Sequence, residues 1–594
     1  MKIFRNFLLL FSLYISTTTF FYSGTILVES CNAIDKEALL DFKHRVTTTP
    51  SNLLRTWVSN TNCCTRWEGV GCDSATGRVI NITGSYQESG DPVWKTASMS
   101  GTLSPFLGNL TYLRLIDLSD LKNLHGSIPQ ELGKLSLLTH LFLNGNKLSG
   151  SIPESFSRLQ KLQVLSLNAN ELSGIIPDSL FQSMKSLSQL FLSQNKISGR
   201  VPESIGKLSR LEYLSLSGNK LTGHVPSTIG ELISLQHIDL GYNKLTGSLP
   251  NSIGNLTKIE TMYFNDNKLT GKLPSTLGYL PKLLDLVLSN NHFIGQIPTS
   301  FGNFKSLQTL DITRNQVVGP LPTQLAKIDT LINLEVSYNP LALVTIPRWI
   351  LTKYSLNQIA LAGTGLKGEL PRQLSSSRVS YLDLSSNELS GKLPSWMASM
   401  GLNTLNLSNN NFYSTIPVEF KKFVNLAYLD LHNNNFYGPL NNVFDKEGEA
   451  YRVIDVSSNM FSGPLDRNIG NKTTVGPLLM SLILSNNPLG GSIPKSIGKL
   501  TGLEVLAMAG NRLTGKIPEE LGNAKELSTL VISSNELSGS IPKKVLNLEK
   551  LKVFDVSRNR LSGKIPDHRL NIPASAFFGN PGLCGLPLPL CKHS

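Results

Sequence analysis

The chain has 594 residues, a net charge of +13 and a pI near 9.3, with 16% charged and 7% aromatic residues. This length ordinarily predicts several globular domains, and a basic balance ordinarily raises nucleic acid as a partner. A sequence period of about 24 residues replaces the first expectation with a single repeating array. Lys and Arg are spread through the repeats without a basic run, which argues against nucleic acid and favours a solvated rim or an anionic polysaccharide.

Residues 1–30 have the features of a secretory signal peptide. Lys2 and Arg5 precede an apolar run from Phe7 to Ile15, and small polar residues follow. An uncleaved anchor is the alternative interpretation. No later segment reaches the roughly 18 apolar residues that a membrane-spanning helix requires, so we expect secretion and no membrane span in this chain.

Residues 31–76 are expected to cap the start of the array. Ala38, Leu39 and Phe42 recur at helical spacing and predict a short amphipathic helix. Trp57 and Trp67 follow in a segment rich in cysteine. The first repeat of an array would otherwise expose its apolar end to water, so a helix and two indole rings form a plausible lid.

Residues 77–566 contain about twenty repeats, for which LQHIDLGYNKLTGSLPNSIGNLTK (residues 235–258) is representative. The alternating LQHIDL segment predicts a short strand, and strands of successive repeats are expected to stack into one parallel sheet. Asn243 falls at an apolar phase, so its amide must bond backbone groups of its own and the neighbouring repeat. Gly-x-Leu-Pro then turns the chain, and the following I-G-x-L segment returns in a helical or 3₁₀ turn. The array is therefore an α/β solenoid.

Residues 567–594 are expected to close the other end of the array, with Phe577, Phe578 and Leu583 covering the last repeat. All cysteines lie at the two ends of the chain, which indicates stapled caps in an oxidising compartment. Adjacent Cys63 and Cys64 are poor partners for each other. The preferred pairing is Cys31 with Cys63, Cys64 with Cys72, and Cys584 with Cys591. A zinc site in the N-terminal cluster is a weaker alternative, because no His accompanies it at ligand spacing.

The candidate binding residues lie at outward strand positions. We call Asn243 and the equivalent residues of the other repeats the marker asparagines. The outward positions are those one, two, four and six residues before each marker Asn. Aromatic side chains that face water on a rigid sheet are typical of interfaces, although such rings also cover neighbouring backbone. The candidate ligand-binding residues are His140, Phe142, Phe191, Tyr213, His237, Asp239, Tyr242, Tyr263 and Asp266. Later repeats are mostly Ser, Asp, Asn and Val at these positions, with Glu335, Tyr381 and His432 among the exceptions.

Five N-x-S/T sequons predict N-glycosylation, at Asn81, Asn109, Asn255, Asn406 and Asn471. Asn406 occupies an outward strand position, so a glycan there would block that part of the inner face. If Asn406 is occupied, the N-terminal half of the array is favoured as the binding zone.

The repeat L-x-x-L-x-x-L-x-L-x-x-N-x-L-x-G-x-I-P-x-x-L-G-x resembles the plant-specific class of leucine-rich repeats. The stretch from DKEALLDFKHRV to GVGC resembles the lid that precedes such repeats, and GNPGLCGLPLPLC resembles their C-terminal cap. The resemblance covers nearly everything after the signal peptide. It implies a right-handed superhelix with a parallel β-sheet on the concave face and 3₁₀ or short helical turns outside.

By this resemblance the chain is expected to recognise a peptide or protein in plant signalling or defence, secreted to the apoplast or cell wall. A membrane receptor kinase would act as co-receptor and hold it at the plasma membrane, and the basic surface would associate with pectin. The alternatives are a polygalacturonase-inhibitor-like inhibitor of a wall-degrading enzyme and a truncated receptor-kinase ectodomain. We find no catalytic constellation, so we expect no enzyme activity, no cofactor and no metal.

Overall fold

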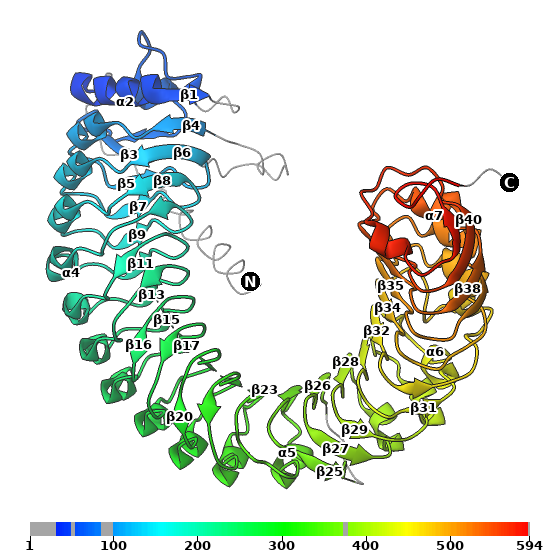
Figure 1. Ribbon diagram of the computed structural model, residues 1–594. Coiled ribbons are helices and arrows are strands. Elements are labelled where there is room, and N and C mark those ends of the chain that lie inside the picture. The colour runs from blue at the N-terminus through cyan, green and yellow to red at the C-terminus, as the bar shows by residue number, and fades with distance from the viewer. Residues whose placement is uncertain (1–30, 49–53, 85–98, 372–377, 592–594) are drawn as a thin grey trace. The chain divides into compact units, whose positions relative to one another are not determined.

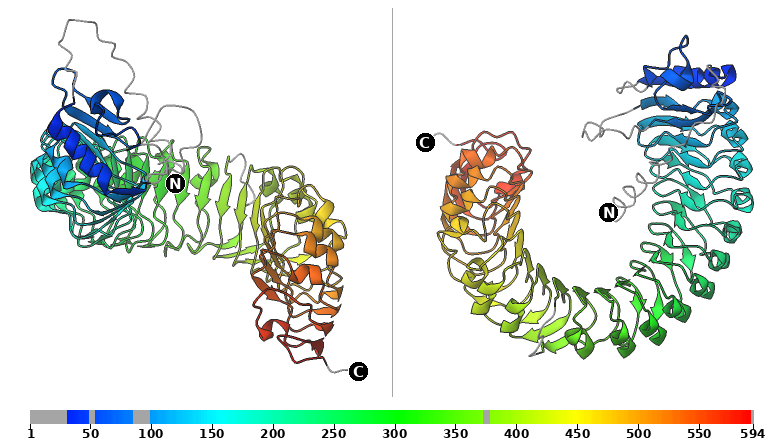
Figure 2. Two further views of the ribbon diagram at one scale, coloured as in Figure 1. Left: turned by 90° about the horizontal axis from the view of Figure 1, so that it is seen from above. Right: turned by 180° about the vertical axis from the view of Figure 1, so that it is seen from behind.

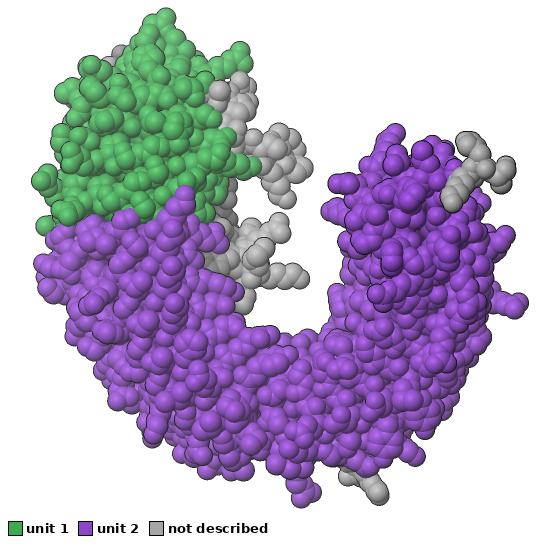
Figure 3. All heavy atoms as spheres, in the orientation of Figure 1, with its two compact units in different colours: residues 1–173 green, residues 174–594 purple. Residues whose placement is uncertain are grey.

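The computed structural model describes residues 31–48, 54–84, 99–371 and 378–591. The expected signal peptide, residues 1–30, lies outside the described residues. The chain divides into two compact units, residues 1–173 and 174–594, coloured separately in Figure 3. We describe each unit by itself. Within the described residues, no helix combines the length and apolar character needed to cross a bilayer.

Unit 1 begins with the expected helix, α2 (Ala33–Arg45), whose first backbone N–H groups are capped by the side chain of Asn32. A second helix, α3 (Cys63–Arg66), follows later in the cap and carries two of the cysteines. The rings of Trp57 and Trp67 stack with centroids 5.4 Å apart, and both are buried. The indole N–H of Trp57 donates to the carbonyl of Glu68 at 2.8 Å. The two rings therefore form a core of their own in the cap, as the sequence indicates.

A buried ion pair joins helix α2 to the first strand of the array. Asp35 is fully buried and accepts two hydrogen bonds from the Arg78 guanidinium, at 2.8 and 2.9 Å. The same carboxylate accepts from the backbone N–H of Val79 at 2.8 Å. All of its partners are charged or backbone donors, which offsets the cost of removing the carboxylate from water.

The other elements of unit 1 that lie wholly within the described residues form two sheets and three 3₁₀ turns. In one sheet β3, β5, β7 and β9 are parallel neighbours and β2 pairs antiparallel with β3. In the other, β4, β6, β8 and β10 are parallel and β1 pairs antiparallel with β4. The bounds are β1 (Val46–Thr48), β2 (Val70–Cys72), β3 (Val79–Thr83), β4 (Met99–Thr102), β5 (Leu115–Asp117), β6 (Lys122–Ser127), β7 (His140–Phe142), β8 (Lys147–Gly150), β9 (Val164–Ser166), β10 (Glu171–Leu172), η4 (Pro105–Asn109), η5 (Gln130–Lys134) and η6 (Glu154–Arg158).

Unit 2 is organised around one long parallel sheet, and each strand pairs in register with the next. These strands line the inner side of the curved unit, with the short helices on its outer side (Figure 1). The strands are β11 (Gln189–Phe191), β13 (Tyr213–Ser215), β15 (His237–Asp239), β17 (Thr261–Tyr263), β19 (Asp285–Val287), β21 (Thr309–Asp311), β23 (Asn333–Glu335), β24 (Gln358–Ala360), β26 (Tyr381–Asp383), β28 (Thr404–Asn406), β30 (Tyr428–Asp430), β32 (Val453–Asp455), β34 (Ser481–Ile483), β35 (Val505–Ala507), β37 (Thr529–Val531) and β39 (Val553–Asp555).

The inward residues of each repeat fill the core between the sheet and the outer turns. In the representative repeat every apolar residue at an inward phase is buried: Leu235, Ile238, Leu240, Leu245, Leu249, Ile253 and Leu256. Ile238 is the middle residue of β15, so its neighbours His237 and Asp239 take the opposite face of the sheet. Burial of the apolar side chains thus decides which residues are left to face outward.

The marker asparagines form a ladder of hydrogen bonds, as the sequence predicts. The Asn243 amide nitrogen donates to the carbonyls of Leu216, Leu240 and Gly241 at 3.0 to 3.2 Å. Its side-chain oxygen accepts from the N–H of Leu221 in the preceding repeat at 3.0 Å. Each rung therefore satisfies backbone groups in two repeats that no strand partner reaches.

The outer side of unit 2 carries 3₁₀ turns and short helices, again as expected, and the view from behind shows the same arrangement (Figure 2). Gly230 lies where successive turns meet, because a Cβ there would come within 2.3 Å of the Ser252 carbonyl oxygen. The elements are α4 (Asp178–Ser183), η7 (Glu203–Lys207), η8 (Ser227–Glu231), η9 (Asn251–Asn255), η10 (Ser275–Tyr279), η11 (Thr299–Asn303), η12 (Thr323–Lys327), α5 (Arg348–Thr352), η13 (Ser395–Ser399), η14 (Val418–Lys422), α6 (Asn441–Phe444), η15 (Ile469–Asn471), η16 (Lys495–Lys499), η17 (Glu519–Asn523), α7 (Lys543–Leu546) and η18 (Ala574–Phe577).

A second set of short parallel strands follows the marker asparagines, which the sequence analysis did not predict. These strands use the L-x-G segment, where two or three residues per repeat pair with the same segment of the next repeat. They are β12 (Ser198–Gly199), β14 (Lys220–Leu221), β16 (Thr246–Gly247), β18 (Lys268–Leu269), β20 (Ile294–Gly295), β22 (Gln316–Val317), β25 (Lys367–Glu369), β27 (Glu388–Gly391), β29 (Asn411–Phe412), β31 (Tyr437–Gly438), β33 (Met460–Phe461), β36 (Thr514–Lys516), β38 (Glu536–Gly539), β40 (Arg560–Lys564) and β41 (Gly582–Cys584).

The C-terminal cap follows the expected plan with one correction. Phe577 and Leu583 are buried, but Phe578 is 71% exposed, so the prediction that it covers the last repeat is wrong. Phe577 ends the 3₁₀ turn η18 with its ring on the buried side, and Phe578 is the residue that follows the turn. Asn580 continues the asparagine ladder, donating to Val556 and Phe577 and accepting from Leu561 N–H.

Candidate functional site

The outward residues of unit 2 fall into two columns because the strands pair in register. The first residues of β13, β15, β17 and β19 are Tyr213, His237, Thr261 and Asp285. The third residues of β11, β13, β15 and β17 are Phe191, Ser215, Asp239 and Tyr263. The structure thus brings together most of the unit 2 candidates, and it adds Asp285 and Ser215 to them.

Tyr213 and His237 form the aromatic centre of this face. Their rings stack with centroids 4.6 Å apart and planes inclined by 14°. His237 Nδ1 lies 2.9 Å from the Thr261 hydroxyl, and Nε2 lies 3.9 Å from a Glu260 carboxylate oxygen. Burial lowers the pKa of His237, and the charges of Glu260 and Asp285 offset part of that effect. The stack therefore offers a neutral, preorganised aromatic surface.

Tyr263 lies at the edge of the same surface, with its hydroxyl directed at a carboxylate. The phenol donates to Asp285 Oδ2 at 3.3 Å. Burial is the main cause that raises the pKa of Tyr263, and the nearby Asp285 raises it further. Tyr263 thus remains a protonated donor near neutral pH. We use the term aromatic patch for Phe191, Tyr213, His237 and Tyr263.

Asp239 and Ser215 are the polar groups beside the aromatic patch. Asp239 accepts a hydrogen bond from the N–H of Gly241 at 3.0 Å, and burial raises the pKa of Asp239 against the opposing effect of the Ser217 hydroxyl. Ser215 is only 4% exposed, and its hydroxyl has no hydrogen-bond partner among the described residues. A buried hydroxyl without a partner is costly, so it marks a place where a ligand atom would be stabilised.

Tyr242 and Asp266 follow their strands and lie in the turns rather than in the sheet. Both have left-handed backbone, with φ of 53° and 55°. Tyr242 is 63% exposed, and the charge of Asp266 is the main cause that raises the pKa of its phenol. The two residues therefore flank the sheet face at one side.

His140 and Phe142 belong to unit 1, at the ends of β7. Their rings lie 6.1 Å apart, and His140 Nδ1 lies 2.8 Å from the Thr139 hydroxyl. Burial lowers the pKa of His140. This pair has the outward placement that the sequence predicts, within its own unit.

A second polar group, absent from the predicted set, lies further along the sheet of unit 2. Asp311 and Glu335 are register neighbours on β21 and β23. Glu335 accepts from the Gln358 amide at 3.0 Å, and burial together with the charge of Asp311 raises the pKa of Glu335 to about 7. The Thr313 hydroxyl beside them is buried without a partner. The outward-position rule names Glu335 among the exceptions of the later repeats, but the sequence alone does not show its burial beside Asp311.

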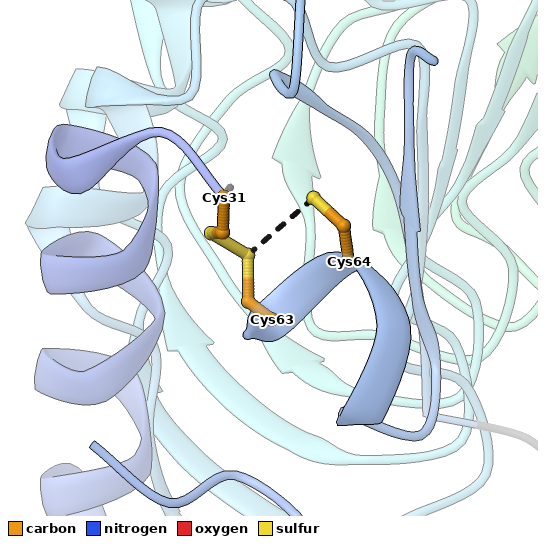
Figure 4. Close-up of side chains that lie close together, drawn as sticks. All are labelled: Cys31, Cys63 and Cys64. Atoms are coloured by element: carbon orange, nitrogen blue, oxygen red, sulfur yellow. Dashed lines mark hydrogen bonds between the residues drawn. A yellow bond between two sulfur atoms is a disulfide. The ribbon is translucent and has the colours of Figure 1, made fainter. Parts of the chain in front are cut away.

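Two clusters of metal-ligand residue types occur within the described residues. In the N-terminal cap the sulfurs of Cys31, Cys63 and Cys64 lie close together (Figure 4), but they belong to the disulfides Cys31–Cys63 and Cys64–Cys72. These pairs and Cys584–Cys591 match the expected pairing, and the cap thiols are not available as thiolate ligands.

The other cluster comprises Asp430 on β30, His432 in the turn after β30 and Asp455 on β32, all at outward positions. His432 Nδ1 lies 2.7 Å from Asp430, and Nε2 lies 3.0 Å from the Asn409 amide nitrogen. The imidazole therefore already has a partner on each nitrogen, as in an ordinary hydrogen-bonded network.

The sequons differ in placement. Asn109, Asn255 and Asn471 are exposed and each is the last residue of a 3₁₀ turn, η4, η9 and η15. Asn81 is half-buried on β3. Asn406 ends β28 at an outward position, where its side-chain oxygen accepts from the Ser408 N–H and hydroxyl. Glycan occupancy at all five stays a prediction.

Comparison with protein families gives three kinds of match. A model described as "Leucine rich repeat N-terminal domain" matches residues 32–73. A model described as "Leucine rich repeat" matches residues 174–221. A further repeat model matches residues 137–159, 161–183, 234–256, 282–304, 378–400, 401–423, 478–500 and 502–524. None of these models describes a catalytic domain.

Among solved structures, the Arabidopsis receptor kinase HAESA, in complex with the peptide hormone IDA and the co-receptor SERK1, is 31% identical with a TM-score of 0.60. That match covers 94% of this chain and 99% of the other. The ectodomain of GASSHO1/SCHENGEN3 from Arabidopsis thaliana, in complex with CASPARIAN STRIP INTEGRITY FACTOR 2, is 33% identical with a TM-score of 0.79. It covers 90% of this chain and 62% of that chain.

Among curated proteins, the Arabidopsis thaliana DNA damage-repair/toleration protein DRT100 is 36% identical over 132 residues. The match covers 22% of this chain and 35% of that protein, so the chain spans about a third of the length of this curated relative.

Proposed function

The chain belongs to the plant leucine-rich-repeat proteins of the receptor-like class, and on that premise we propose that it binds an extended peptide. The peptide would lie along the solvent-facing side of the sheet in unit 2, where the outward strand residues line the inner side of the curve (Figure 1). The observation that carries the proposal is the aromatic patch with Asp239 and the unpartnered hydroxyl of Ser215 beside it. Aromatic rings and polar groups fixed on rigid strands lose little conformational entropy on binding.

The dimensions of the sheet suit such a ligand. Adjacent strands lie about 4.8 Å apart, and an extended peptide of about ten residues spans roughly 33 Å. That length corresponds to about seven strands, so one peptide would cover β11 to β23 and reach both the aromatic patch and Glu335. A protein ligand would present an extended segment to the same strands.

The setting that we propose is extracellular, in the apoplast or cell wall. The disulfides of both caps favour an oxidising compartment. We infer that a membrane receptor kinase serves as co-receptor, since the HAESA structure contains a peptide hormone and a co-receptor. The protein acts by binding, without catalysis, in signalling or defence. Association with pectin through the basic surface stays a prediction from the net charge.

The test uses the full chain, secreted from a eukaryotic host, and fluorescently labelled pools of random ten-residue peptides. Joint replacement of Phe191, Tyr213 and Tyr263 by Ser is expected to weaken binding at least tenfold, as loss of aromatic anchors does. The matched control replaces Val505, Val531 and Val553 by Ser, three outward residues on β35, β37 and β39. It is expected to bind normally. Equal binding by the aromatic variant and the parent would contradict the proposal.

The same protein should be assayed against a fungal polygalacturonase. Inhibition of that enzyme, without binding by any peptide pool, would favour the inhibitor function raised by the sequence. Co-purification with a receptor kinase would favour the function proposed here.

A further inference from the structure

The charge on the inner face of unit 2 is opposite to the charge of the whole chain. The chain carries +13, yet the strands of the main sheet, β11 to β39, contain no Lys or Arg. From β15 to β26 their outward positions carry Asp239, Asp285, Asp311, Glu335 and Asp383. Basic residues therefore lie off the strands, and a ligand on the sheet meets carboxylates.

Asp239 provides the first of two polar subsites. Among the described residues, its carboxylate accepts hydrogen bonds from neutral donors, the N–H of Gly241 and the hydroxyl of Ser217. Ser215 is its register neighbour on β13 and points its unpartnered, buried hydroxyl to the same face. Tyr263 and the stacked pair of Tyr213 and His237 border this position. A desolvated carboxylate between aromatic rings is a favourable environment for a cation. We use the term Asp239 subsite for this group.

Glu335 and Asp311 provide the second polar subsite. Gln358 contributes a neutral donor to Glu335, and the buried hydroxyl of Thr313 has no partner among the described residues. The guanidinium of Arg314 lies 4.4 Å from the centroid of the Tyr338 ring, and no ion pair between Arg314 and either carboxylate is formed in the described structure. The two neighbouring carboxylates thus lack a matching positive charge. We use the term Glu335 subsite for this group.

We propose, on the premise of the peptide-binding function above, that the ligand is a basic peptide with one Lys or Arg side chain in the Asp239 subsite and a second in the Glu335 subsite. Asp239 and Asp311 are three strands apart, which corresponds to about 14 Å. An extended chain advances about 3.4 Å per residue, so the two basic residues lie about four positions apart. The aromatic patch then binds the side chains around the first of them.

The experiment measures binding of the full chain to labelled ten-residue peptide pools by fluorescence polarisation. In one pool two positions four residues apart are Lys and the others are random uncharged residues. Two matched pools carry norleucine or Glu at the same positions. A third matched pool carries two Lys residues that are only two positions apart. We expect the first pool to bind at least tenfold more tightly than each of the others, because an ion pair in a partly desolvated site favours the charged partner.

Two isosteric variants assign the effect to the subsites. Asp239→Asn and Glu335→Gln are each expected to weaken binding of the two-lysine pool about tenfold and so to remove most of its advantage over the norleucine pool. The matched control is Asp430→Asn, at the same position of β30, where His432 already lies against the carboxylate. Ser215→Ala, a smaller change that folds readily, is expected to weaken the same pool by about threefold.

The outcomes separate this inference from the function on which it rests. Tight binding that depends on the aromatic patch but is equal for the lysine and norleucine pools would overturn the basic-peptide inference alone. Failure of every pool to bind would contradict the proposed function and the inference together. Loss of lysine preference in Asp430→Asn as well as Asp239→Asn would place the cation elsewhere and overturn the assignment.

Discussion

The two ends of the sheet in unit 2 share one scaffold and differ in what they present. From β11 to β23 the outward positions hold the aromatic patch and the two carboxylate subsites. From β34 to β37 the same positions hold only small or aliphatic, uncharged residues: Ser481, Ile483, Val505, Ala507, Thr529 and Val531. The asparagine ladder nevertheless continues at both ends: Asn243 and Asn535 each donate to three carbonyls, and Asn243 accepts from one backbone N–H while Asn535 accepts from two. Fold and recognition are therefore carried by separate residues of each repeat.

The largest expected effect comes from adding a glycan to the face of β13, compared with removing the sequon on β28. Tyr213→Asn creates the sequon Asn-Leu-Ser at the first residue of β13, and the same tripeptide begins at Asn406, the last residue of β28. Glycosylation there is expected to reduce binding of the tightest peptide pool by roughly a hundredfold or more, because the glycan covers the face. Asn406→Gln should change binding by less than about twofold.

Tyr213→Gln removes the ring without a sequon and serves as the control. Glycan attachment is read from the mass of the intact protein. Strong binding by glycosylated Tyr213→Asn would mean that the ligand occupies another surface.

The next effect breaks the scaffold equally at both ends. Asn243→Leu and Asn535→Leu each leave several buried backbone groups without a partner, at a local cost of about 3 kcal/mol. An array of repeats does not unfold in two states, so the measurement is amide hydrogen exchange at β15 and β37. A cost at one end several-fold larger than at the other would refute the equivalence of the ladder.

A smaller effect separates the two ends by their outward chemistry. Tyr263 and Val531 occupy the same position of their repeats, four residues before Asn267 and Asn535. Tyr263→Ser is expected to weaken peptide binding about tenfold, whereas Val531→Ser should leave it unchanged. Fluorescence polarisation with the same labelled pool gives both values. Comparable losses in the two variants would show that recognition extends over the whole sheet.

The smallest effect is a dependence on pH that only one end should show. Glu335 has a pKa of about 7 in the folded protein, against 4.5 for an ordinary Glu. Between those values the folded state binds more protons than the unfolded state, so local stability at β23 falls as pH rises from about 4.5 to about 7. A bound cation favours the ionised form, so peptide affinity should rise over the same range.

Hydrogen exchange of β23 and β37 at several pH values tests this prediction, since the outward residues of β37, Thr529 and Val531, do not titrate. Glu335→Gln is the control and should remove the slope at β23. A slope that survives in Glu335→Gln would have to come from another group.

The sequence predicts the repeating scaffold well because local rules of burial and hydrogen bonding determine the place of each recurring residue within the repeat. Burial of Leu235 and Ile238 fixes the strand faces, and the polar phase of Asn243 requires the ladder that the structure contains. The sequence does not predict features that depend on the geometry between neighbouring repeats. The short strands after each Asn depend on how L-x-G segments align, and the exposure of Phe578 depends on which of two adjacent rings turns inward.

The candidate site was only partly predictable for the same reason. Outward positions follow from alternation, so Tyr213, His237, Asp239 and Tyr263 could be named in advance. The buried hydroxyl of Ser215 could not, because its burial depends on neighbours one strand away on each side. Likewise the raised pKa of Glu335 arises from burial and from Asp311, a residue 24 positions earlier in the repeat before it.

Thr364, which replaces the marker Asn in one repeat, gives the sheet of unit 2 a mechanical weak point. Its hydroxyl donates to Leu361 in its own repeat, so the amide rung from the marker position to the repeat of Asn339 is missing here. Side-chain links that remain between these two repeats include Ala362 N–H to the Ser337 hydroxyl and the Gln358 amide to Glu335. Close by, the Trp349 indole N–H and the Ser355 hydroxyl are buried and have no hydrogen-bond partner within the described part of the chain. Pulling or heating is therefore expected to part the sheet between β23 and β24 first, so that the strands with the aromatic patch unfold as one cooperative block and those beyond β24 as another.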